Sequence, residues 1–269
     1  MSLQIRQTRF EKGRPLVAVS LTGTTGEEIA EQTRKAVEQQ VQVIEWRADY
    51  YLAAISDLKE KLLESEVYLD MLKIMDEVEQ IAGDIPRIFT IRTKGQGGEI
   101  DLDQSVIGDI QLFMAQTGLA DFVDIEVKAF KPEFGGIGGS LLKKRVDDIH
   151  KEGSKVILSY HDKEEMIPAV FIVKLVTAMS KYRPDICKVA AMANSKEDAN
   201  SLIKATAYLD KTEDIPMITM AMGKHGISTR VIGGKYGSLV TFASVGAPSA
   251  PGQIPAGVLR ERLDEFYGA

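Results

Sequence analysis

The sequence predicts a (β/α)8 barrel, a closed ring of eight parallel strands with a helix after each strand. The chain has 269 residues, 44% of them hydrophobic, and a parallel barrel uses about 250 residues as one domain. Short runs of β-branched and apolar residues recur eight times, and stretches with helical periodicity separate them. Strands that alternate with helices pair in parallel through right-handed crossovers. Since no linker or repeat divides the chain, we expect residues 1–269 to form a single domain.

The eight candidate strands follow one another at spacings that leave room for a helix in between. They are residues 16–21, 41–46, 87–91, 122–127, 155–160, 186–190, 217–222 and 239–245. Before the first of them, residues 3–10 alternate apolar and polar side chains, which predicts a strand or hairpin outside the barrel.

Five of the intervening stretches show clear helical periodicity. They are residues 27–39, 105–116, 141–151, 167–179 and 196–209. Thr25 and Ser195 precede two of them and can cap the first turn with a side-chain oxygen. We expect extra helix within 53–82 and only a short helix at 228–234. A doubly wound open sheet is the structural alternative, because it has the same alternation of strands and helices.

Charge and composition argue against several classes of protein. The net charge is -6, whereas nucleic-acid binding requires clustered cationic side chains. The N-terminus lacks the apolar segment of a secretory signal, and no apolar run approaches the roughly 18 residues of a membrane span. We therefore expect a cytoplasmic protein. His150, His161, His225 and the single cysteine, Cys187, lack zinc-ligand spacing, so we expect no metal.

Lys188 is the most informative single residue. It stands near the end of an otherwise apolar strand, where burial disfavours the charged amine and makes it a better nucleophile. Such an amine can form an imine with a ketone. A lysine at a strand edge can instead extend its charged end into water, and the local sequence leaves both interpretations open.

Other ionisable residues occur at the carboxyl ends of the predicted strands, where barrel enzymes have their active sites. Period two places Glu45 and Arg47 on one face of the second strand. Arg92 and His161 end the third and fifth strands, and Arg230 follows the seventh. Each residue alone has a plain alternative, such as a surface ion pair or a helix-terminus charge. Together they predict a cationic mouth that attracts a small acid and disfavours protonation of the neighbouring lysine.

The segment 246–255 follows the last strand and combines small residues and prolines with two polar side chains, Ser249 and Gln253. This composition predicts a lid that closes over the site and excludes water. The alternative is an ordinary connection to the final helix.

Five motifs resemble the signatures of the type I 3-dehydroquinate dehydratase family, in the family's order from about residue 15 to the C-terminus. They are Glu45-Trp46-Arg47-Ala48-Asp49, Phe89-Thr90-Ile91-Arg92-Thr93, Ser159-Tyr160-His161-Asp162, Cys187-Lys188-Val189-Ala190 and Ser249-Ala250-Pro251-Gly252-Gln253. The resemblance implies a (β/α)8 barrel, usually a homodimer, that converts 3-dehydroquinate to 3-dehydroshikimate in the shikimate pathway of aromatic amino acid biosynthesis. It also implies that no metal or organic cofactor takes part.

By position, Lys188 resembles the family's imine-forming lysine, and His161 resembles its general base and acid, with an imidazole pKa near the usual 6.5. The resemblance implies that Glu45 orients His161 and that Arg230 holds the substrate carboxylate. The substrate-binding residues implied in this way are Arg47, Arg92, Arg230, Ser249, Gln253, Gln96, Met220 and Met222. Many family members have a glutamate at the position of Gln96, so this chain departs from the pattern there.

Two other functions are compatible with part of this pattern. Another Schiff-base barrel enzyme, such as a class I aldolase or transaldolase, would share Lys188 but break a carbon–carbon bond. A noncatalytic barrel that binds a carboxylated metabolite would keep Lys188 protonated. The combination of His161, Glu45 and Arg230 with the predicted lid favours the dehydratase.

Overall fold

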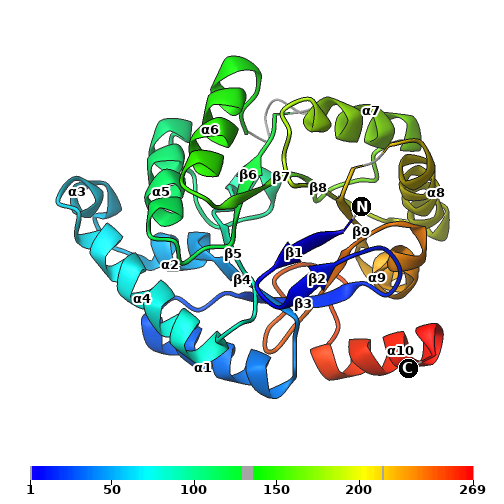
Figure 1. Cartoon of the computed structure of the whole chain (residues 1–269), viewed down its shortest axis with the longest axis horizontal. Coiled ribbons are helices and arrows are strands. Elements are labelled where there is room, and N and C mark those ends of the chain that lie inside the picture. The colour runs from blue at the N-terminus through cyan, green and yellow to red at the C-terminus, as the bar shows by residue number, and fades with distance from the viewer. Residues whose placement is uncertain (1, 129–135, 214, 269) are drawn as a thin grey trace.

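A computed structural model describes residues 2–128, 136–213 and 215–268, and its strands form a (β/α)8 barrel (Figure 1). The parallel strands lie in the order β10-β3-β4-β5-β6-β7-β8-β9. Their bounds are β3 (Leu16–Leu21), β4 (Val43–Arg47), β5 (Arg87–Thr90), β6 (Phe122–Glu126), β7 (Lys155–Asp162), β8 (Ile186–Met192), β9 (Met217–Met222) and β10 (Val240–Ala243). The ring closes where the Leu239 N–H donates to the Met217 carbonyl at 2.9 Å. The open-sheet alternative is therefore wrong.

Helices surround the barrel, and short 3-10 turns occupy some of the loops (Figure 1). They are α1 (Gly26–Glu38), α2 (Ala48–Ala54), α3 (Leu58–Leu63), α4 (Glu66–Ala82), η1 (Lys94–Gln96), α5 (Gln104–Gln116), α6 (Gly139–Lys151), α7 (Ala169–Ser180), α8 (Lys196–Thr212), η3 (Lys224–Gly226), α9 (Ile227–Ile232), η4 (Gly233–Tyr236) and α10 (Ala256–Tyr267). The predicted caps are present, because Thr25 accepts from the Glu28 N–H and Ser195 from the Asp198 N–H.

Two helix boundaries differ from the prediction for backbone reasons. The extra helical segment at 53–82 is divided because Asp57 and Ser65 have left-handed backbone, with φ of 57° and 62°. A helix cannot continue through such a residue. The helix predicted from residue 167 begins at Ala169, because Pro168 has the extended ψ of 140° and stands before the first turn.

The N-terminal residues form the predicted hairpin outside the barrel. Strands β1 (Leu3–Ile5) and β2 (Thr8–Phe10) pair antiparallel and lie across the barrel end that faces the viewer in Figure 1. Ile5 and Phe10 are buried in the same cluster as the inward residues of the barrel strands, and the Phe10 ring lies 5.4 Å from the Phe122 ring. The hairpin thus seals the amino-terminal end of the strands with apolar side chains.

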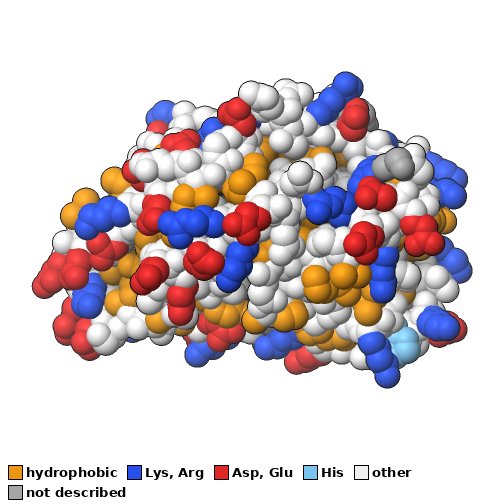
Figure 2. Space-filling model, turned by 90° about the horizontal axis from the view of Figure 1, so that it is seen from below, with side chains coloured by type: hydrophobic (Ala, Val, Ile, Leu, Met, Phe, Trp, Pro, Cys, Tyr) orange, Lys and Arg blue, Asp and Glu red, His pale blue; other side chains and the backbone are white. Residues whose placement is uncertain are grey.

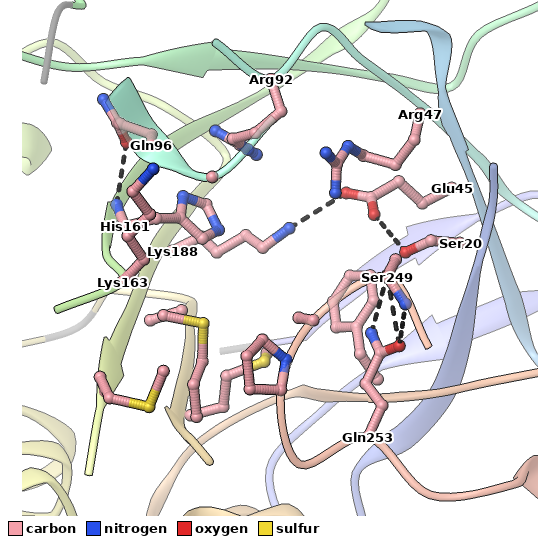
Figure 3. Close-up of a pocket in the computed structure, with 18 residues that line it drawn as sticks. Ser20, Glu45, Arg47, Arg92, Gln96, His161, Lys163, Lys188, Ser249 and Gln253 are labelled. Atoms are coloured by element: carbon pink, nitrogen blue, oxygen red, sulfur yellow. Dashed lines mark hydrogen bonds and ion pairs between the residues drawn. The ribbon is translucent and has the colours of Figure 1, made fainter. Parts of the chain in front are cut away.

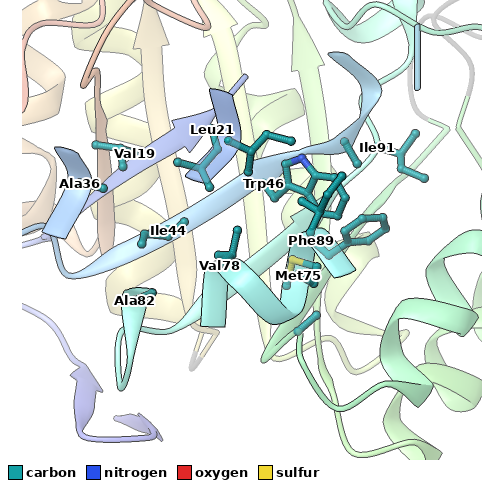
Figure 4. Close-up of a cluster of buried hydrophobic side chains, with 14 of the residues drawn as sticks. Val19, Leu21, Ala36, Ile44, Trp46, Met75, Val78, Ala82, Phe89 and Ile91 are labelled. Carbon is teal, nitrogen blue, oxygen red and sulfur yellow. The ribbon is translucent and has the colours of Figure 1, made fainter. Parts of the chain in front are cut away.

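Alternation along the strands sorts the side chains into an outer core and a barrel interior. Ile44 and Trp46 of β4 face outward and belong to the cluster that includes Met75 and Val78 of α4 (Figure 4). The inward residues of the same strand change along its length. Val43 lies in the apolar interior, whereas Glu45 lines a pocket at the carboxyl end. The interior is therefore apolar at one end and polar at the other.

Acidic and basic side chains are interspersed on the flank of the molecule shown in Figure 2, and no large cationic patch gathers there. In the part of the chain that the structure describes, no helix has the length and apolar character needed to cross a membrane.

Candidate active site

A pocket of about 280 Å³ lies at the carboxyl ends of the strands and is lined on one side by the segment after β10 (Figure 3). The structure brings together ten of the eleven residues predicted for the site. These are Glu45, Arg47, Arg92, Gln96, His161, Lys188, Met220, Met222, Ser249 and Gln253. The remaining residue, Arg230, is buried and does not line the pocket.

Lys188 reaches into this pocket from β8 and is only 4% exposed, so the burial expected of it is confirmed. Its Nζ lies 3.1 Å from Glu45 Oε1, 3.8 Å from Asp124 Oδ2 and 4.4 Å from the centre of the Phe242 ring. Two carboxylates thus lie within ion-pair distance of this amine. Of the arginines that we expected beside the amine, Arg47 and Arg92 are paired with acids of their own, whereas Arg230 donates to backbone carbonyls.

Glu45 is held by three side chains. Its Oε1 accepts from Lys188 at 3.1 Å and from Thr90 at 3.0 Å, and its Oε2 accepts from Ser20 at 2.6 Å. Burial opposes ionisation, but the positive charges of Lys188 and Arg47 outweigh it and lower the pKa of Glu45 to about 2. Glu45 is therefore an anion directed at the lysine, and its contacts do not include the predicted one to His161.

His161 lines the opposite side of the pocket, at the end of β7 (Figure 3). Its backbone N–H donates to Gln96 Oε1 at 2.9 Å, and its Nδ1 is buried with no hydrogen-bond partner among the described residues. Burial, together with the charges of Arg92 and Lys188, lowers the pKa of His161 well below 6.5. The prediction of an unperturbed pKa is therefore wrong, and the imidazole is neutral near pH 7.

Gln96 uses its side-chain amide to bind backbone groups. It is 2% exposed, accepts from the His161 N–H, and directs its Nε2 toward the Val127 carbonyl at 3.4 Å. The amide thus joins the loop after β5 to β6 and β7 while it lines the pocket.

Arg92 is fixed by two carboxylates that sequence reasoning did not single out. Its guanidinium donates to Asp124 at 3.0 Å and to Glu126 at 2.8 Å, and also to Ser159 at 2.9 Å. Burial works against the charged guanidinium, but the two carboxylates outweigh it and raise the pKa of Arg92. A signal was present, because period two places both acids on the inward face of a buried strand.

Arg230 holds the lid segment, residues 246–255, through hydrogen bonds to its backbone. It is 1% exposed and donates to the carbonyls of Gly252 at 2.8 Å, Pro251 at 3.2 Å and Phe242 at 3.0 Å. Burial lowers the pKa of Arg230 to about 10, which leaves it charged at neutral pH. A ligand carboxylate that forms two parallel hydrogen bonds with this guanidinium would have to replace at least one of these contacts.

The segment 246–255 closes the pocket with Ser249 and Gln253 facing each other. Gln253 Oε1 accepts from the Ser249 N–H at 2.8 Å, and its Nε2 donates to Ser249 Oγ at 2.9 Å. Gly252 has φ of 79°, and a Cβ there would lie 2.4 Å from the Gly223 carbonyl oxygen. This close approach requires glycine.

The barrel and its polar pocket define the class of protein. A pocket at the carboxyl ends of parallel barrel strands, with a few convergent polar groups, is typical of (β/α)8-barrel enzymes. Over the described ranges, no group of three or more His, Cys, Asp or Glu side chains is arranged to hold a metal ion.

Comparison with known proteins gives the family. The model of the type I 3-dehydroquinase family matches residues 17–268, so the chain belongs to this family. It is 33% identical to the 3-dehydroquinate dehydratases of Klebsiella pneumoniae, over 267 residues, and Lactiplantibacillus plantarum, over 266 residues, with 98% of each chain covered. The 3-dehydroquinate dehydratase of Geobacillus kaustophilus has a TM-score of 0.87 at 27% identity, covering 100% of this chain and 98% of that one. The Clostridium difficile type I enzyme, solved with covalently modified comenic acid, gives the same values.

Proposed function

We propose that this chain converts 3-dehydroquinate to 3-dehydroshikimate and water, in the shikimate pathway, by syn elimination through an imine on Lys188. The observation that carries the proposal is a buried lysine that shares one pocket with a neutral histidine. Relatives that match almost the whole chain are named 3-dehydroquinate dehydratase. Adding 3-dehydroquinate to the purified protein should produce the ultraviolet absorbance of the enone product. Carbon–carbon cleavage products in place of the enone would favour an aldolase.

Lys188 supplies the covalent step. Its amine adds to the C3 ketone, and loss of water gives a protonated imine that draws electrons away from C2. His161 removes the acidified C2 proton. The resulting enamine expels the C1 hydroxyl, which takes a proton from His161 and leaves as water. Hydrolysis of the imine then frees the product and restores the amine of Lys188.

The remaining pocket residues bind and orient the substrate. We propose that Arg47 and Arg92 donate to ring hydroxyls, because their guanidinium groups are fixed by acids and still line the cavity. Glu45 would accept from a substrate hydroxyl and stabilise the cationic imine on Lys188. Met220 and Met222 offer apolar contact to the ring. Gln96 contributes a buried amide to the pocket lining, and Ser249 and Gln253 cover the bound acid from the lid.

We expect Arg230→Lys to raise KM for 3-dehydroquinate by about 10- to 100-fold, with a smaller change in kcat. Lysine keeps the charge but loses the fork that grips a carboxylate with two parallel hydrogen bonds. Steady-state kinetics measure the effect, and Arg9→Lys is the control, since Arg9 pairs with Glu11 at the surface. An unchanged KM would remove Arg230 from the role of carboxylate clamp.

On the acidic side of the pH profile, the fall in kcat should occur well below pH 6.5. His161 acts as a base only when neutral, and burial lowers its pKa, so the base is available across the neutral range and is lost only on acidification. The measurement is the pH profile of kcat with substrate deuterated at C2, whose isotope effect shows where C–H cleavage limits the rate. An apparent pKa at or above 6.5 on the acidic side would contradict the assignment.

We also propose that residues 1–269 form one domain, that the protein is cytoplasmic, and that it is a homodimer, the last of which the family resemblance implies. Light scattering on the purified protein should give twice the mass of one chain. A monomer at all concentrations would contradict the dimer. Cell fractionation that finds the protein outside the cytoplasm would contradict the location.

A further inference from the structure

Asp49 stands in the first turn of α2, directly after β4, and is 0% exposed. Its carboxylate forms a bidentate ion pair, called the fork below, with the guanidinium of Arg47. Arg47 Nε donates to Oδ1 at 2.7 Å, and Nη2 donates to Oδ2 at 2.8 Å. Two parallel bonds of this kind fix the orientation of a guanidinium plane as well as its position. Arg47 lines the pocket, whereas Asp49 does not contribute to its lining among the described residues.

The same carboxylate is anchored from the other side by the backbone after β5. The Arg92 N–H donates to Oδ1 at 3.2 Å, and the Glu99 N–H donates to Oδ2 at 3.1 Å. Each oxygen therefore accepts two hydrogen bonds, one from Arg47 and one from the loop. Because this fully buried carboxylate accepts four hydrogen bonds, its orientation is fixed.

The loop that holds Asp49 also reaches His161. Gln96 lies between the two backbone donors, and its Oε1 accepts from the His161 N–H at 2.9 Å. Figure 3 shows Arg47 and Gln96 on different sides of the pocket, with Lys188 extending between them. Asp49 thus connects Arg47, on one side of the pocket, to the loop after β5 that contacts His161 on the other side.

We infer that Asp49 is a positioning residue for the dehydration, which acts by holding the Arg47 guanidinium in the orientation that binds the substrate. The inference rests on the substrate-binding role proposed for Arg47. Asp49→Asn is the sharpest change, because it keeps the size but replaces one acceptor oxygen with an NH2 group. That group would face N–H donors and leave the fork incomplete.

A double-mutant cycle in the full-length protein tests the inference. Asp49→Asn should raise KM by about 10- to 100-fold, as expected for a misplaced binding group, with a smaller change in kcat. In the Arg47→Ala background the same replacement should change KM less than about threefold, because the group that Asp49 positions is absent. A purely structural role would not give this dependence on Arg47.

Asp185→Asn is the matched control. Asp185 precedes β8 at the other end of the barrel, where it accepts from the Val156 N–H at 2.8 Å and contacts His150 at 2.8 Å. Its replacement should lower the melting temperature and leave KM unchanged. Equal effects of Asp49→Asn in both backgrounds, or no effect in either, would overturn the inference. An unchanged KM in Arg47→Ala would instead overturn the role proposed for Arg47.

Chemical rescue provides a second route if Asp49→Asn does not fold. Guanidinium chloride at millimolar concentration should restore activity to Arg47→Ala, because the Asp49 fork and the vacated space remain. Methylammonium, which cannot form two parallel bonds, should not. Equal rescue by the two cations, or rescue by neither, would overturn the inference.

Discussion

Replacing Lys188 by methionine should lower kcat by about 10⁴-fold or more, the largest effect expected of any single change in this chain. Methionine has a similar length but no amine, so the imine cannot form and the C2 proton stays unactivated. Loss of a covalent nucleophile typically removes most of an enzyme's rate enhancement. Enone formation from 3-dehydroquinate, followed by ultraviolet absorbance, measures the loss.

Stability must be measured with the same variant, because Lys188→Met leaves the buried Glu45 carboxylate without its ion-pair partner. Ser20 and Thr90 still donate to it, so we expect a lower melting temperature and an intact fold. Lys181→Met, at the exposed end of α7, is the control and should keep full activity. Turnover by a folded Lys188→Met protein within tenfold of the unchanged chain would refute the covalent mechanism.

Replacing His161 by alanine should separate imine formation from elimination. Without a base in reach of C2, elimination should slow by about 10²- to 10⁴-fold. The amine of Lys188 is unchanged, so borohydride should still trap a substrate adduct, although more slowly, because His161 also transfers protons while the imine forms. Single-turnover absorbance and intact mass, measured on one sample, report the two steps.

His150→Ala provides the comparison, since His150 contacts Asp185 far from the pocket. It should keep both adduct and enone formation. If His161→Ala formed the enone at an unchanged rate, His161 would not be the base, and another group would have to remove the C2 proton.

The barrel could be predicted from the sequence because its signals are local. Alternation between strand and helix patterns fixes the parallel topology, and period two places Glu45 and Arg47 on one face. The same argument correctly placed His161 at the carboxyl end of its strand, whereas Lys188 is the third residue of β8 and reaches the pocket from within the strand. Residues 3–10 alternate in the way that a hairpin with one buried face requires.

The pairings within the site could not be predicted, because they depend on contacts between distant strands. Nothing near Arg92 in sequence indicates that Asp124 and Glu126 hold it, and nothing near Arg230 indicates that lid carbonyls occupy its donors. The lowered pKa of His161 arises from burial among groups on other strands. Similarly, the left-handed backbone at Asp57 that divides the extra helical segment has no clear sequence signal.

The proposed mechanism requires an imine between Lys188 and the substrate. The direct measurement is to add 3-dehydroquinate and sodium borohydride to the unchanged protein, record the intact mass, and map the modified peptide. We predict one covalent adduct, carried by the peptide that contains Lys188 and absent from Lys188→Met. Turnover without any adduct, or an adduct on another lysine alone, would contradict the mechanism.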